Sequence, residues 1–157
     1  MASETEISID RLAGSLDLPT DELSELYVGE AMIGAMFAAT LAIERSTWKW
    51  MGQQIQKGMA GEFFLHLKEQ GATVDQIGEW RLMIDARFAE YRLCLQGYEE
   101  LEPPWKLGRQ FYWNMIGDER YVAMSIKIAT LYLLEIRDAA QKLMNQYGPT
   151  LIVNFTG

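Results

Sequence analysis

The side chains that most often carry out chemistry in proteins are few in this chain and far apart. It contains one histidine, His66, and one cysteine, Cys94. Glu62 precedes His66 by four positions, whereas helical di-metal sites use a Glu-x-x-His spacing on two helices and therefore need two histidines. Glu30 and Glu44 lie about 21 Å apart along one helix, so they cannot share a metal ion. We therefore expect neither a metal site nor a Ser/His/Asp or Cys/His catalytic arrangement.

Cofactor motifs are equally scarce. His66 follows the apolar residues Phe63–Leu65, which is compatible with a haem ligand, but a lone helical histidine near a glutamate is more often structural. Cys94 is expected to be a buried structural thiol, because no nearby pattern indicates an activated thiolate. The glycines match neither the dinucleotide fingerprint nor the phosphate-binding loop. We therefore predict no cofactor and a non-enzymatic protein.

Aromatic residues are the clearest candidates for binding. Trp48 and Trp50 lie two positions apart, which places them on different sides of a helix end. The stretch PPWKLGRQFYWNM interleaves aromatic residues with Lys106 and Arg109. The three consecutive aromatic residues 111–113 cannot all face one core, so at least one should point to a second surface. Core packing, a protein interface and a small-molecule pocket all use such residues, and tryptophan, tyrosine and arginine are enriched at interface hot spots.

The negative charge is concentrated at the N-terminal end. Residues 1–44 contain nine acidic residues and one basic residue, giving −8, whereas residues 45–157 contain 13 of each. This disfavours nucleic acid and anionic membranes and favours a partner protein with a basic surface; the alternative is a solvated segment that aids solubility. The predicted partner-binding residues are Asp17, Asp21, Glu22, Glu25, Trp48, Trp50, Trp105, Arg109, Tyr112 and Trp113.

The elements that must position these residues are predicted to be helices, because proline occurs only at positions 19, 103, 104 and 149. We predict a short helix over 8–16 and helices over about 20–51, weakened at Gly52, and 53–70, ending at Gly71. A third main helix opens at a Thr73–Gln76 capping box and carries an apolar stripe over 77–98. The last two helices are predicted over 104–116 and 119–147. The first of them ends at Gly117, and the second ends at Gly148 and Pro149.

The run GEAMIGAMFAATLAIE, residues 29–44, is apolar on all sides. Its uncharged part, 31–43, would span about 20 Å as a helix, which is too short for the ~30 Å core of a bilayer. We therefore predict a central helix, and we predict a homodimer whose second subunit would share it. The small residues that would allow close packing along it are Ala31, Gly34, Ala35, Ala38 and Ala42.

These expectations combine into one all-α domain, a helical bundle of about five main helices and a short N-terminal helix. Residues 1–19 form an acidic N-terminal segment, 20–148 the helical core and 149–157 an extended tail, with residues 5–9 and 150–155 as possible paired strands. The single cysteine and the absence of a basic, apolar leader indicate a cytoplasmic protein. The predicted function is a protein-interaction module, such as a regulator, adaptor or inhibitor. The alternative is a helical bundle that binds a small molecule or cofactor, either as a binding protein or as an enzyme, with a pocket lined by Met32, Met36 and tryptophans.

Overall fold

The computed structural model describes residues 25–96, 103–117 and 122–156. They form five helices and, within these ranges, no strand: α2 (Glu25–Ser46), α3 (Lys49–Glu69), α4 (Val74–Cys94), α5 (Pro103–Ile116) and α6 (Val122–Thr156). The predicted all-α bundle is confirmed. The expected helix over 8–16 and the expected strand over 5–9 lie outside the described residues.

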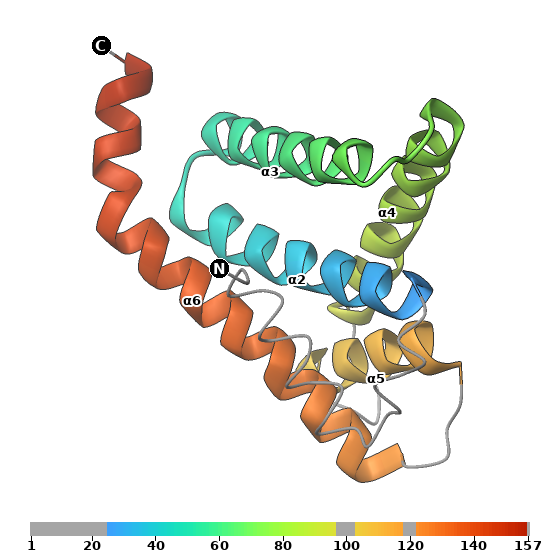
Figure 1. The fold of residues 1–157 in the computed structure, drawn as a ribbon. Coiled ribbons are helices and arrows are strands. Elements are labelled where there is room, and N and C mark those ends of the chain that lie inside the picture. The colour runs from blue at the N-terminus through green and yellow to red at the C-terminus, as the bar shows by residue number, and fades with distance from the viewer. Residues whose placement is uncertain (1–24, 97–102, 118–121, 157) are drawn as a thin grey trace.

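Helix α2 is the centre of the bundle, because it packs against each of the other four helices. Figure 1 shows α3 lying beside α2 and running in the opposite direction, with α4 crossing at one end of the pair. Helix α6 runs diagonally past α5 and α2 and makes its largest contacts with these two helices. At 35 residues it is about 50 Å long, longer than either helix that it packs against.

Aromatic rings from four helices fill the core around α2. The ring of Phe37 lies 5.2 Å from that of Phe88 and 5.3 Å from that of Tyr91, both on α4. Phe111 of α5 lies 6.5 Å from Tyr91 and stacks on Tyr132 of α6 at 5.6 Å, both measured between ring centroids. These rings are buried or half-buried, so one continuous aromatic cluster joins α2 to α4, α5 and α6.

The small residues allow these helices to approach one another closely. Ala31, Ala35, Ala38, Ala42 and Gly34 are all buried. A Cβ atom added at Gly34 would lie 2.7 Å from Cδ2 of Phe111, and one added at Gly108 of α5 would lie 2.9 Å from Cα of Thr130 on α6. Neither position has room for a side chain, so glycine sets the α2–α5 and α5–α6 separations.

The break between α2 and α3 differs from the prediction of one helix over 20–51. Helix α2 ends at Ser46, and Trp48, in an extended conformation, precedes α3. The hydroxyls of Ser46 and Thr47 donate to the carbonyls of Ala42 and Ile43 at 2.7 and 3.2 Å. These side-chain bonds occupy carbonyls of the last turn and help the chain to leave the helix. Gly52, predicted as the weak point, is instead buried within α3.

Other helix ends follow their local signals. Gln76 N–H donates to Thr73 Oγ1 at 3.2 Å and Thr73 N–H donates to Gln76 Oε1 at 2.8 Å, which is the predicted capping box of α4. Gly71 and Gly117 have φ angles of +92° and +67°. Both follow a helix directly or within two residues, where a left-handed conformation favours glycine. Helix α4 ends at Cys94, and Tyr98, the last residue of its predicted stripe, lies outside the described residues.

The C-terminal prediction was wrong, because α6 continues through Gly148 and Pro149 to Thr156. Residues 149–156 are therefore helical rather than an extended tail, and no strand forms over 150–155. Proline removes one backbone hydrogen bond from a helix. Each later residue regains one by extending a helix that is already formed, whereas a single strand would need a mate. No described helix is both long enough and apolar enough to cross a bilayer.

Candidate functional site

The outer face of α5 carries two exposed tryptophans. Trp105, Arg109 and Trp113 are spaced by four residues and therefore lie along one side of the helix; we call them the α5 stripe. Trp105 and Trp113 are 36% and 47% exposed, and Arg109 is exposed. The opposite side of α5, with Leu107, Phe111 and Met115, is buried. The helix is thus fixed by its inner face while it presents an aromatic and cationic outer face.

Tyr112 does not belong to this surface. It is 6% exposed and lies in the core with Phe111, which is fully buried. Of the three consecutive aromatic residues, Trp113 alone turns outward, in agreement with the argument that all three cannot face one core. The prediction of Tyr112 as a partner-binding residue is corrected, because a buried ring cannot meet a partner on this surface.

A second exposed aromatic pair lies where α2 turns into α3. Trp48 is 67% exposed and Trp50 is 53% exposed. This turn lies close to α6, because Gln141 Nε2 donates to Ser46 Oγ at 2.5 Å. Of the acidic residues predicted to bind a partner, Asp17, Asp21 and Glu22 lie outside the described residues, as does the side chain of Glu25.

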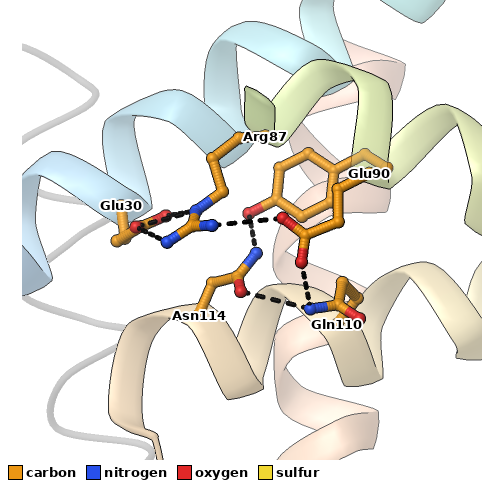
Figure 2. Close-up of polar contacts among 6 residues, drawn as sticks. Glu30, Arg87, Glu90, Gln110 and Asn114 are labelled. Carbon is orange, nitrogen blue, oxygen red and sulfur yellow. Dashed lines mark hydrogen bonds and ion pairs between the residues drawn. The ribbon is translucent and has the colours of Figure 1, made fainter. Parts of the chain in front are cut away.

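A partly buried polar network connects α2, α4 and α5 (Figure 2). The carboxylate of Glu30, fully buried on α2, accepts from Arg87 Nε at 2.9 and 3.0 Å and from Nη2 at 2.7 Å. Arg87 Nη1 donates to Glu90 Oε2 at 3.1 Å, and Gln110 Nε2 donates to Glu90 Oε1 at 2.6 Å. Gln110 Nε2 also donates to Asn114 Oδ1 at 3.1 Å. The network thus ties one buried carboxylate to two neighbouring helices.

The electrostatics of this network favour a structural role. The hydrogen bonds that Arg87 donates to Glu30 are the main reason that the pKa of Arg87 is raised, so the guanidinium remains charged. Burial raises the pKa of Tyr91, whose hydroxyl accepts from Asn114 Nδ2 at 3.3 Å, so the phenol stays protonated at neutral pH. A fixed ion pair and a neutral phenol orient the three helices. They do not form an activated nucleophile or base.

Sequence reasoning considered Glu30 only as a metal ligand and missed its pairing with Arg87. The available signal was a glutamate at the edge of an apolar, central helix, since a buried carboxylate needs a cation. The sequence does not tell which arginine supplies that cation, because residues 30 and 87 are 57 positions apart.

An open pocket of about 340 Å³ lies between α2, α5 and α6, and we call it the Arg45–Arg137 pocket. Its walls are apolar, with Leu41 of α2, Leu107 of α5 and Leu134 of α6 among them. Arg45 and Arg137 are the charged residues among the described part of its lining. The ligand-binding alternative predicted a pocket lined by methionines and tryptophans, but neither residue type is found among the described residues that line this one.

The residues with classical catalytic or ligand chemistry remain dispersed. His66 is exposed near the end of α3, and Cys94 is half-buried, with its pKa raised by burial. Across the described ranges, no group of three or more histidine, cysteine or acidic side chains is arranged to hold a metal ion. No protein-family model, curated protein or solved structure matches this chain.

Proposed function

We propose that this chain is a non-enzymatic, cytosolic protein-interaction module that binds a partner through the α5 stripe. The observation that carries the proposal is the pair of exposed tryptophans on either side of Arg109, on a helix whose inner face is anchored in the core. Tryptophan and arginine are the residues that most often dominate interface energetics. A rigid helix also presents them without an ordering cost at binding.

The magnitude of such a contact is sufficient for recognition. Covering the exposed part of one tryptophan contributes on the order of 2 kcal/mol to the free energy of binding, at about 25 cal/mol per Å² of apolar surface buried. Two tryptophans therefore supply a central hot spot, and Arg109 lies between them on the same face of α5. Trp48 and Trp50 at the α2–α3 turn provide a second site for the same partner or for another subunit.

The acidic residues at the N-terminal end of the chain support a partner with a basic surface. Residues 1–24 hold six acidic residues and Arg11, a net charge of −5, out of −8 for the whole chain. Such a segment accelerates association with a basic protein and makes the affinity depend on salt. We also propose that the chain is a homodimer, whose mass in solution would be twice 18.0 kDa by light scattering.

The test compares partner capture from the native host by the wild-type protein and by the double variant Trp105→Ala, Trp113→Ala. The matched control is Leu82→Ala, Leu93→Ala, because these α4 side chains are also exposed, at 73% and 67%. We expect the control to retain the wild-type partner and the tryptophan variant to lose it, with an affinity loss of at least about tenfold for the purified pair. Equal affinity of the two variants, or affinity independent of salt, would contradict the proposal.

A further inference from the structure

The Arg45–Arg137 pocket combines an apolar interior with positive charge in an acidic protein. Eight of its lining residues are aliphatic or proline, from Ala38 and Leu41 on α2 to Leu133 and Leu134 on α6. The remaining two described lining residues are the arginines, and none of the lining residues that the structure describes is acidic. The chain has a net charge of −8, so a pair of arginines at one pocket differs locally from the charge of the whole chain.

The positive charges of Arg45 and Arg137 are only weakly balanced by acidic side chains. Arg137 Nη2 lies 3.3 Å from Oδ1 of Asp138, a side chain that is 64% exposed. Within the described part of the chain, no ion pair involves Arg45. Arg87, by contrast, makes short bonds to a buried carboxylate. Arg45 and Arg137 are therefore available to bind an anion. To do so, Arg137 would lose only its long, solvent-exposed contact with Asp138.

We propose that this pocket binds a small amphipathic carboxylate, such as a medium-chain fatty acid. The aliphatic walls would take the hydrocarbon chain, and Arg45 and Arg137 would bind the carboxylate at the mouth. A guanidinium donates two parallel hydrogen bonds to a carboxylate, which gives this head group an advantage over a neutral alcohol. The inference does not depend on the proposed function of the α5 stripe.

The volume indicates the size of the ligand. About 340 Å³ lies near the lower end of the range typical of ligand pockets. At the packing density of a protein interior, this space holds a chain of roughly ten carbon atoms. Each buried methylene adds about fourfold to the affinity, so a ten-carbon acid should bind far more tightly than a four-carbon acid.

The test is calorimetric titration of the full chain with decanoate, together with decanol, decyltrimethylammonium and butyrate as comparison probes. We expect one decanoate to bind per chain, with decanol weaker by about tenfold or more and no binding of the other two at the same concentration. Methyl NMR should place the decanoate-induced shifts at leucines of the pocket, such as Leu41, Leu107 and Leu134.

Three variants separate the charge from the cavity. The double variant Arg45→Gln, Arg137→Gln should lower the affinity for decanoate by at least about tenfold and leave the affinity for decanol nearly unchanged. Leu134→Trp should fill the pocket and abolish binding of both, and circular dichroism would verify its fold. The matched control, Arg81→Gln, removes an exposed arginine that lies over Phe64 and outside the pocket, and it should bind decanoate as the wild type does.

Several outcomes would overturn the proposal. These are the absence of saturable decanoate binding, equal affinity for decanoate and decyltrimethylammonium, or unchanged affinity after both arginines are replaced. Methyl shifts confined to exposed leucines outside the pocket, such as Leu82 and Leu93, would indicate nonspecific adsorption and would also overturn it. Because decanoate and decanol are compared on the wild-type protein, the result stands even if Leu134→Trp does not fold. Replacing the α5 tryptophans should not affect decanoate binding, so this proposal and the proposed function fail independently.

Discussion

Replacement of Arg87 by methionine should destabilise the fold by about 3 kcal/mol, because it leaves the carboxylate of Glu30 buried without a cation. Glu30 is fully buried, and its two oxygens accept three contacts from Arg87 of 2.7–3.0 Å. Breaking a buried pair on one side typically costs about 3–5 kcal/mol. The side chain of Arg87 is 26% exposed, so water can partly replace it, and we place the cost at the lower end of that range.

The matched control is Arg92→Met, which removes the same kind of pair at the surface. Arg92 contacts Glu44 at 2.6 and 3.2 Å, but the two side chains are 42% and 39% exposed. An exposed pair contributes at most about 1 kcal/mol. The two variants carry the same chemical change and lose similar hydrogen bonds, so they differ mainly in burial. We expect the decrease in the free energy of unfolding to be about three times larger for Arg87→Met than for Arg92→Met.

The assay is urea denaturation followed by far-ultraviolet circular dichroism at pH 7, for both variants and for the double variant Glu30→Leu, Arg87→Met. The double variant should recover most of the loss, because it removes the stranded charge together with its partner. Equal losses for Arg87→Met and Arg92→Met, or no recovery in the double variant, would refute the reasoning.

Three further predictions concern packing and ionisation. Gly108→Ala should lower the free energy of unfolding by about 1–3 kcal/mol, because the added Cβ meets α6. Gly58 has open space around it, so Gly58→Ala should raise the free energy of unfolding by about 0.5–1 kcal/mol in the same denaturation assay. Burial raises the pKa of Tyr91, so above pH ~10 the unfolded state loses its proton first and stability falls as the pH rises. Tyr91→Phe should show a shallower alkaline loss, and an equal slope would contradict the assignment. The raised pKa of Cys94 predicts that iodoacetamide at pH 8 modifies the folded protein several times more slowly than the urea-unfolded chain, as mass spectrometry would measure.

Much of the helical architecture could be predicted because its signals are local. The Thr73–Gln76 capping box, the glycines after α3 and α5, and the proline at the start of α5 each act within one turn of their own position. The outward turn of Trp113 was predictable for the same reason, since three consecutive residues on a helix point in three directions.

Local signals failed where two tendencies competed. Pro149 is a strong helix-ending signal, yet the helix continues, because extension of an existing helix satisfies backbone groups that an isolated strand would leave unpaired. At the α2–α3 break, the hydroxyls of Ser46 and Thr47 bind carbonyls of the preceding turn, and this outweighed the weakness expected at Gly52.

The sequence by itself determined the helical class, most helix ends and the central position expected of the small, apolar α2 segment, because all of these follow from periodicity and short-range hydrogen bonding. The tertiary structure alone decided that Arg87 neutralises Glu30, that Tyr112 is buried, and that Arg45 and Arg137 share one pocket. These are contacts between residues far apart in the chain. They depend on the angles and separations of packed helices, which residue types and spacing along one chain do not specify.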